Sequence, residues 1–187
     1  MNPTCLDDVV KTYRDHGHRQ YGEDVTELQP ALQCATFALQ ANEPPVVVAA
    51  ALLHDYGHLC HHFSEDIADQ GVDAQHEQIG YSRLRRLFTA EIVDAGRLHV
   101  AAKRYLCWQE KDYFKGLSEA SRKSLALQGG PMNDDEAHEF EREPHFRLAV
   151  RVRHYDDMGK VRHMITPELE SFVPLLQSFV RTTLHEP

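Results

Sequence analysis

The 187-residue sequence has no long apolar run and no excess of positive charge. No apolar stretch approaches the roughly 20 residues that span a bilayer, and residues 1–5 lack the basic and apolar regions of a signal peptide. Lys and Arg number 20 against 29 Asp and Glu, which gives a formal net charge of −9. We therefore expect a cytoplasmic protein that has no membrane partner and presents no basic face to nucleic acid.

Cysteine is scarce and widely spaced. The chain has four cysteines, at positions 5, 34, 60 and 107, and no two of them form a CxxC pair. This spacing argues against a zinc cluster built on cysteine and favours free thiols. Histidine, by contrast, occurs 13 times, so any metal site is expected to rest on imidazole and carboxylate ligands.

The sequence also lacks a Ser/Gly-rich linker, an internal repeat and any run of alternating β-branched residues. Apolar residues recur with helical spacing nearly throughout. The length suits one domain with a sizeable core. We therefore expect an all-α bundle of seven or more helices that forms a single domain over residues 1–187.

Capping residues and prolines predict where the helices begin. Ser, Thr and Asn favour N-caps, proline favours the first helical turn, and glycine favours helix ends. By these rules the helix that opens at Pro44-Pro45 runs to about His61, and another ends at Gly129-Gly130. The other expected starts are Thr26, Thr89, Ser118, Asn133 with Glu136 in a capping box, and Pro144, and two further helices are expected near 74–87 and 167–183.

The most informative stretch is 51–58, where an apolar helical run ends in His54-Asp55 and His58 follows one turn later. A histidine and a carboxylate at the end of a buried helix are unfavourable unless something pairs with them, and a metal ion is the usual partner. Neighbouring helical side chains diverge by about 100°. His54 and Asp55 could therefore serve one metal from two directions, or Asp55 could bridge two metals.

Three more candidate ligands stand in similar helical settings, namely His76, His99 and Asp156. Lys103 lies one turn after His99 and on the same helical face. A lysine ammonium beside a metal ligand is unfavourable unless an anion lies between them. This spacing predicts an anionic substrate above the metal.

These residues match the pattern H…HD…H…H…D, and the chain resembles the HD-domain superfamily from about residue 21 to 160. The closest resemblance is to the organophosphonate-cleaving HD oxygenases, mixed-valent diiron enzymes related to myo-inositol oxygenase. The segments that carry it are YGE at 21–23, LLHDYGH at 52–58, HEQIG at 76–80, LHVAAKRYL at 98–106, SLALQGGPM at 124–132 and DDMGK at 156–160.

The resemblance implies a two-iron site. Asp55 would bridge the irons, with His54 and Asp156 on the first iron and His76 and His99 on the second. Asp55, His58 and Lys103 are the expected catalytic residues. The residues expected to contact substrate are Tyr21, which would also contact the second iron while the site is empty, Glu23 at the amino end, and His58, Lys103, Ser121, Ser124 and Lys160 around the phosphonate.

The implied reaction uses O2 and an Fe(II)/Fe(III) pair. It would cleave the C–P bond of a 1-hydroxy-2-aminoethylphosphonate or its N-trimethylated form. The products would be phosphate and glycine or glycine betaine. The implied partners are thus a small anionic organophosphonate and O2, and the sequence does not indicate an oligomeric state.

Pro30 departs from the family pattern, because it stands in ELQPALQCA at 27–35 where the family's first histidine is expected. Proline is tolerated near a helix start, so the fold is compatible with it, but the first iron would lose a protein ligand. Two alternatives therefore remain. One is a metal-dependent HD phosphohydrolase acting on a nucleotide or phosphoester through a metal-activated water, and the other is a variant of impaired activity that binds ligand without turnover.

Overall fold

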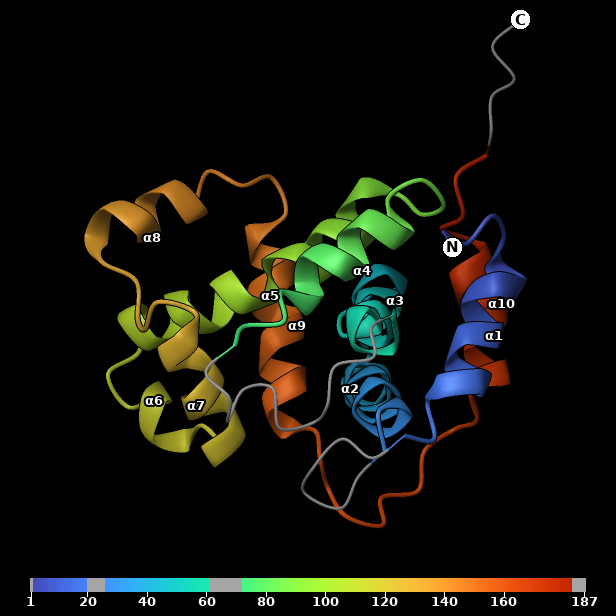
Figure 1. Cartoon of the computed structure of the whole chain (residues 1–187), viewed down its shortest axis with the longest axis horizontal. Coiled ribbons are helices and arrows are strands. Elements are labelled where there is room, and N and C mark those ends of the chain that lie inside the picture. Colours follow the sequence, from blue (N-terminus) through green and yellow to red (C-terminus); the bar gives the residue numbers. More distant parts are fainter. Residues whose placement is uncertain (1, 20–25, 61–71, 183–187) are drawn as a thin grey trace, which may run out of the picture.

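The computed structural model describes residues 2–19, 26–60 and 72–182. Across these ranges the chain is helical and has no strand; Phe88 and Val180 form an isolated antiparallel bridge. No helix in these ranges is long and apolar enough to cross a membrane. The helices are α1 (Leu6–His16), α2 (Leu28–Gln40), α3 (Pro45–Leu53), the 3₁₀ helix η1 (Tyr56–Cys60), α4 (His76–Leu84), α5 (Ala90–Gln109), α6 (Tyr113–Gly116), α7 (Glu119–Leu127), α8 (Asp134–Phe140), α9 (Phe146–Met158), the 3₁₀ helix η3 (Leu169–Phe172) and α10 (Val173–Gln177) (Figure 1).

Helix α3 is the centre of the main core. Its residues from Val47 to Leu53 are all buried, as expected of a helix that is apolar on every side. It packs against α2, α5, α9 and α10. Because α3 ends inside this shell, the His54-Asp55 pair that follows it lies in the interior of the bundle, and His54 is buried.

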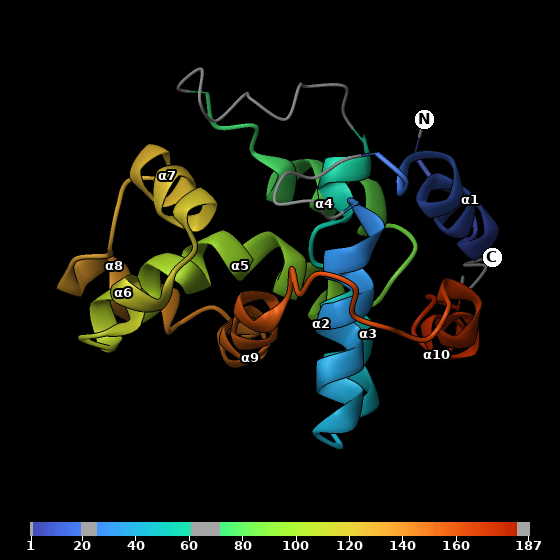
Figure 2. The same ribbon diagram turned by 90° about the horizontal axis from the view of Figure 1, so that it is seen from below.

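Helix α5 links this core to a second, smaller one. With 20 residues it is about 30 Å long. Its later part packs Leu98, Ala102 and Tyr105 against Phe140 of α8 and Ala149 of α9. Helices α6, α7 and α8 gather around this part of α5, on the side away from α1 and α10 (Figure 2).

Several predicted boundaries are confirmed. Thr89 is the N-cap of α5, and Ser118 caps α7 by accepting the Ser121 N–H at 3.2 Å. Asn133 and Glu136 form the expected capping box at α8. After α7 the chain turns through Gly129 and Gly130, whose φ angles of 97° and 73° favour glycine. These signals depend on local chemistry, which explains why the sequence reveals them.

Five predicted boundaries were wrong. The helix expected to open at Pro144 begins at Phe146, with His145 as its N-cap. Glu27, not Thr26, is the N-cap of α2. Helix α3 stops at Leu53 and gives way to η1 instead of continuing to His61, and α4 covers His76–Leu84 instead of 74–87. The expected last helix over 167–183 is divided into η3 and the short α10, because Pro174 has no N–H with which an α-helix could continue through it.

Candidate metal centre

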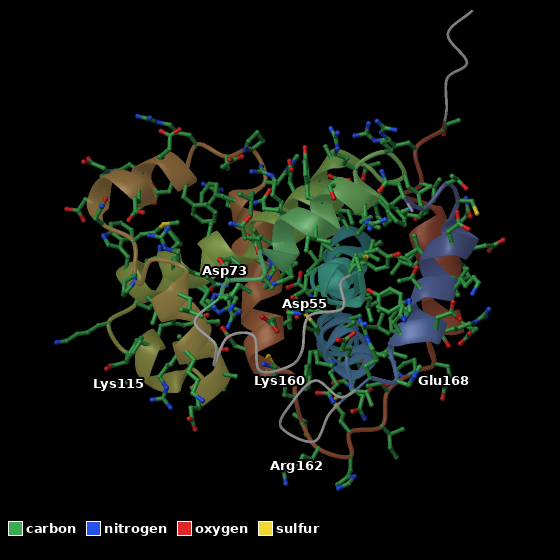
Figure 3. The ribbon with its side chains drawn as sticks, viewed as in Figure 1. Asp55, Asp73, Lys115, Lys160, Arg162 and Glu168 are labelled. Atoms are coloured by element: carbon green, nitrogen blue, oxygen red, sulfur yellow. The ribbon has the colours of Figure 1, made fainter. Side chains whose placement is uncertain are left out.

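Four elements bring the predicted ligands together. His54 and Asp55 follow α3, His76 opens α4, His99 lies in the middle of α5, and Asp156 lies near the end of α9. Figure 3 places Asp55 in the middle of the bundle, between these helices. The five residues are therefore distant in sequence but adjacent in space.

The carboxylate of Asp55 is shared by two groups of ligands. Its Oδ1 lies 3.5 Å from His76 Nε2 and 3.3 Å from His99 Nε2. Its Oδ2 lies 3.4 Å from His54 Nε2, which in turn lies 3.4 Å from Asp156 Oδ1. Each group of three could hold one metal ion, and Asp55 belongs to both. This is the arrangement of a carboxylate that bridges two ions.

The imidazole rings are oriented by their own helices. His54 Nδ1 lies 2.7 Å from the Ala51 carbonyl oxygen and His99 Nδ1 lies 2.6 Å from that of Gly96, so each Nδ1–H donates there. The Nε2 lone pairs then face the centre, as in histidine metal ligands. His54 Nε2 is buried without a hydrogen-bond partner among the described residues. The Nε2 atoms of His76 and His99 are 2.9 Å apart, so these donors fit a cation placed between them.

The charges of the site also suit a cation. Burial lowers the pKa of His76 and of His99, which keeps both rings neutral, as ligation requires. Burial opposes ionisation of Asp55, but the imidazoles, chiefly His54, hold the pKa of Asp55 well below its usual range. His54 itself is buried, yet the Asp55 carboxylate, with help from Asp156, raises its pKa. A positive charge at His54 Nε2 is therefore favoured.

Arg153 is a site residue that the sequence interpretation missed. This buried guanidinium donates from Nη1 to Asp156 Oδ2 at 2.7 Å, which leaves Oδ1 to face His54. It also contacts Asp157 and donates from Nε to the Tyr113 hydroxyl at 3.0 Å. Arg153 and His54 together hold the pKa of Asp156 well below its usual range despite burial. The i, i+3 spacing of Arg153 and Asp156 was the available signal.

His58 packs directly on His76, one of the candidate ligands. Its ring stacks on His76 with centroids 4.0 Å apart and 21° between planes. Burial lowers the pKa of His58 to about 4, so the ring is neutral at neutral pH. The Glu77 carboxylate lies 3.8 Å from His76 Nδ1, and burial raises the pKa of Glu77. His76 thus has a neutral ring stacked on it and an acidic side chain near its Nδ1.

Lys103 is buried beside the ligands and is 3% exposed. Its Nζ donates to Ser124 Oγ at 2.7 Å, and Ser124 Oγ donates to the Ser121 carbonyl at 3.1 Å. Burial, assisted by Arg153, lowers the pKa of Lys103 to about 8. Lys103 and Ser124, both expected around the phosphonate, are therefore in contact, and Ser121 contributes its backbone carbonyl to the same chain of hydrogen bonds.

Lys160 lies just beyond α9 with a φ of 65° (Figure 3). Its charge contributes to lowering the pKa of both His58 and Lys103, which puts three of the predicted substrate contacts in one electrostatic environment. Of the other four, Ser121 and Ser124 lie in α7, whereas Tyr21 and Glu23 lie outside the described residues.

Pro30 is buried in the first turn of α2, where a missing N–H breaks no helical hydrogen bond. Cys34 follows four residues later, on the same face. Its buried thiol lies 3.8 Å from the Val152 carbonyl oxygen, to which it donates, and close enough to His54 for the imidazole to act on its pKa, which burial raises. Helix α2 contains no His, Asp or Glu, so it adds no imidazole or carboxylate to the centre.

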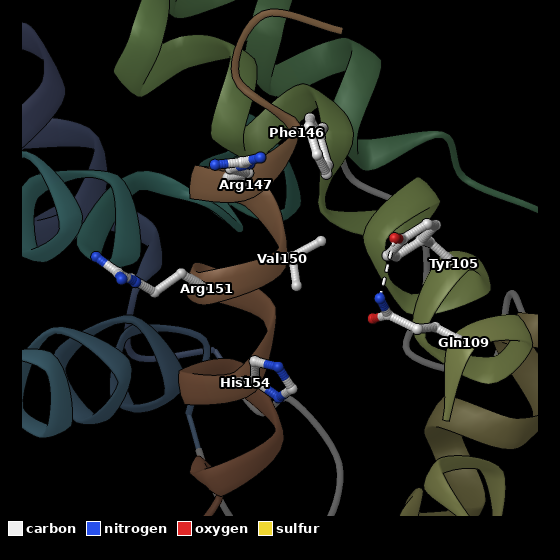
Figure 4. A pocket seen from close by; sticks show the side chains of 7 residues that line it. All are labelled: Tyr105, Gln109, Phe146, Arg147, Val150, Arg151 and His154. Carbon is white, nitrogen blue, oxygen red and sulfur yellow. Dashed lines mark hydrogen bonds between the residues drawn. The ribbon is translucent and has the colours of Figure 1, made fainter. Parts of the chain in front are cut away.

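A separate hollow of about 260 Å³ lies between α5 and α9 (Figure 4). In it Gln109 donates to the Tyr105 hydroxyl at 3.1 Å, opposite Val150 and His154. None of the five ligands lines it. The metal centre is therefore not part of this hollow.

Comparison with known proteins agrees with the ligand pattern. The model of the HD domain matches residues 8–128. The [1-hydroxy-2-(trimethylamino)ethyl]phosphonate dioxygenase (glycine-betaine-forming) of Leisingera caerulea is 44% identical over 88% of this chain and 84% of its own length. The hydroxymethylphosphonate dioxygenase of Gimesia maris is 42% identical over 88% of this chain and 82% of its own length. The chain belongs to the HD-domain family and, over most of its length, is a relative of phosphonate dioxygenases.

Proposed function

We propose that the chain is an iron-dependent oxygenase that cleaves the C–P bond of a 1-hydroxy-2-(amino or trimethylammonio)ethylphosphonate with O2. The products are phosphate and glycine or glycine betaine. The observation that carries the proposal is that the two carboxylate oxygens of Asp55 face two different groups of candidate ligands. The names of two relatives that each match more than four fifths of the chain support the reaction class.

Two iron ions are proposed as the cofactor. His54, Asp55 and Asp156 hold the first, and Asp55, His76 and His99 hold the second. Imidazole and carboxylate ligands suit iron, although they also accept other metals. When bound as an Fe(II)/Fe(III) pair, iron supplies the activation of O2.

Lys103, with Ser124, is proposed to bind the phosphonate. The buried ammonium donates to the Ser124 hydroxyl and is charged below a pH of about 8, so a dianion beside it offsets the unfavourable burial. Lys160 adds a second positive charge nearby. Neutral His58 then offers an imidazole hydrogen bond instead of a charge. Glu23 is proposed for the amino end of the substrate, and Tyr21 is proposed to contact the second iron while the site is empty.

The test uses protein loaded with Fe(II), with phosphate release and O2 uptake as readouts. The substrates are the 2-amino compound, its N-trimethylated form and hydroxymethylphosphonate, which differ at the end away from phosphorus. Phosphate release that requires O2 and is lost in Asp55→Asn supports the proposal. Equal release under argon would rule it out. The ranking of the three substrates defines the specificity.

A metal-dependent phosphohydrolase is the second candidate, and the absence of His, Asp and Glu from α2 favours it. One metal held by Asp55, His76 and His99 would suffice for a hydrolytic water. Hydrolysis of phosphoesters under argon by the wild-type chain would identify this activity. The Pro30→His variant separates the candidates, because added histidine at this position should raise the iron content and O2-dependent turnover of an oxygenase.

A further inference from the structure

Three arginines surround a hollow remote from the ligands. Arg85 and Arg86 follow α4 and Arg181 comes from the C-terminal segment. The hollow measures about 370 Å³ and is also lined by Tyr81 and Asp94. In Figure 1 the C-terminal segment passes beside the turn that joins α4 to α5. Elements from two distant parts of the chain thus build one concave surface.

The hollow carries an uncompensated positive charge. Arg85, Arg86 and Arg181 form no ion pair with any carboxylate of residues 2–19, 26–60 and 72–182, the part of the chain that is described. The carboxylate that lines the hollow, Asp94, is already engaged. Its Oδ1 accepts from Arg97 at 3.0 Å and its Oδ2 lies 2.9 Å from His145 Nδ1. Neighbouring like charges are unfavourable, so this cluster in a chain of net charge −9 favours an anion.

The cluster is held in place by the backbone. Arg181 donates from Nε to the Phe88 carbonyl at 2.7 Å and from its amide to the Leu87 carbonyl at 2.8 Å. Two guanidinium groups lie near the ring of Tyr81, Arg85 at 5.9 Å and Arg97 at 5.6 Å from its centroid. Two of the cations are therefore positioned before any ligand arrives.

The first turn of α5 opens on the same hollow. Ala90, its first residue, lines the hollow, and the N-cap Thr89 makes no side-chain cap bond. The first-turn N–H groups of this 20-residue helix thus receive no hydrogen bond from the Thr89 side chain, and they add a partial positive charge. Helix N-termini with nearby guanidinium groups are well suited to phosphate oxygens.

We propose that this hollow is a binding site for a small molecule that carries a phosphoryl or phosphonyl dianion, separate from the metal centre. Three guanidinium groups and a helix N-terminus can contact more oxygens than a carboxylate provides. His76 and Arg85 lie nine residues apart along α4 and its end, or about 13 Å of helix. The proposal does not depend on the oxygenase activity.

The experiment measures binding of inorganic phosphate, methylphosphonate and adenosine monophosphate by calorimetry at low salt. Metal-free protein carrying Lys103→Met is used, so that the metal centre contributes no anion site. One saturable site is expected. The double variant Arg85→Gln, Arg86→Gln should weaken it at least tenfold, because each charge-assisted phosphate contact is strong. Arg181 is left intact because it anchors the C-terminal segment.

The matched control is Arg142→Gln, Arg147→Gln, which removes the same charge from exposed positions elsewhere and should change affinity less than twofold. Unchanged melting temperatures show that both double variants are folded. The proposal is overturned if no saturable site is found, if the control weakens binding as much as the test pair, or if acetate binds as tightly as phosphate. Comparing the three probes shows whether free phosphate or an organic phosphate is preferred.

Discussion

Asp55 is the residue on which both ligand groups depend, because its two oxygens face different imidazoles. Asp156 belongs to one group only. Asp55→Asn should therefore reduce binding at both subsites, whereas Asp156→Asn should spare the subsite of His76 and His99. Metal content after reconstitution with Fe(II), measured by plasma mass spectrometry, distinguishes the two variants. Equal losses in both would show that Asp55 does not bridge.

The buried charge of Lys103 lowers the stability of the folded protein. The pKa of Lys103 falls from 10.5 to about 8 in the folded state, so protonation of this lysine destabilises the folded protein. The destabilisation is complete below pH 8, and it disappears above about pH 10.5, where the lysine is neutral in both the folded and the unfolded chain. Lys103→Met should raise the free energy of unfolding of metal-free protein at pH 7 by up to about 3 kcal/mol, while abolishing binding of the phosphonate. Urea denaturation gives the first quantity and calorimetry the second.

The pH series provides the control for Lys103→Met. The stability difference between the variant and wild type should shrink as the pH rises from 8 to 10.5, because the wild-type lysine becomes neutral in the folded chain and then also in the unfolded chain. A difference that is constant over this range would assign the gain to packing. Lys115→Met, at an exposed lysine of α6, should show no comparable gain.

At the level of elements, η1 and α4 meet backbone to backbone. A Cβ on Gly57 would lie 1.8 Å from the carbonyl oxygen of His76 and 2.9 Å from the amide nitrogen of Gly80. Gly57→Ala should therefore move α4, destabilise the fold by about 1–3 kcal/mol and weaken metal binding by His76. Urea denaturation and metal titration are the measurements.

The matched substitution is Gly116→Ala in α6, because nothing lies within 4 Å of the Cβ that it adds. Its free energy of unfolding should stay within about 0.5 kcal/mol of wild type. If Gly57→Ala behaved in the same way, the close approach of η1 to α4 would not position His76.

Elements were predictable from the sequence where their signals are local. Ser118 and the Asn133–Glu136 pair define helix starts through contacts within four residues. The end of α3 was not predictable, because the change to η1 accompanies the contact of Gly57 with α4, which is distant in sequence.

The same distinction applies to the site. The sequence predicted that five residues form the site, and the structure brings them together: His54, Asp55, His76, His99 and Asp156. The role of Arg153 could not be predicted from the sequence, because it depends on which oxygen of Asp156 faces His54. The roles assigned to these residues stay predictions until the variants are measured.

For the whole molecule, the ligands connect α3, α4, α5 and α9. A metal that binds only the folded chain should stabilise it by about 2.7 kcal/mol at one hundred times its Kd. For a chain of this size that corresponds to a rise in Tm of roughly 5–10 °C. Calorimetric scans with and without a chelator measure the shift, and Asp55→Asn should show little. That residues 1–187 form a single domain stays a prediction.

The orientation of His54 and His99 is set three residues back along their own backbones, at Ala51 and Gly96. Each candidate ligand and the contact that fixes its tautomer are therefore encoded together within four consecutive residues. Such a segment is a portable unit for design. A graft onto an unrelated helical scaffold would carry this contact with the histidine, whereas Asp156 would have to be transferred together with Arg153.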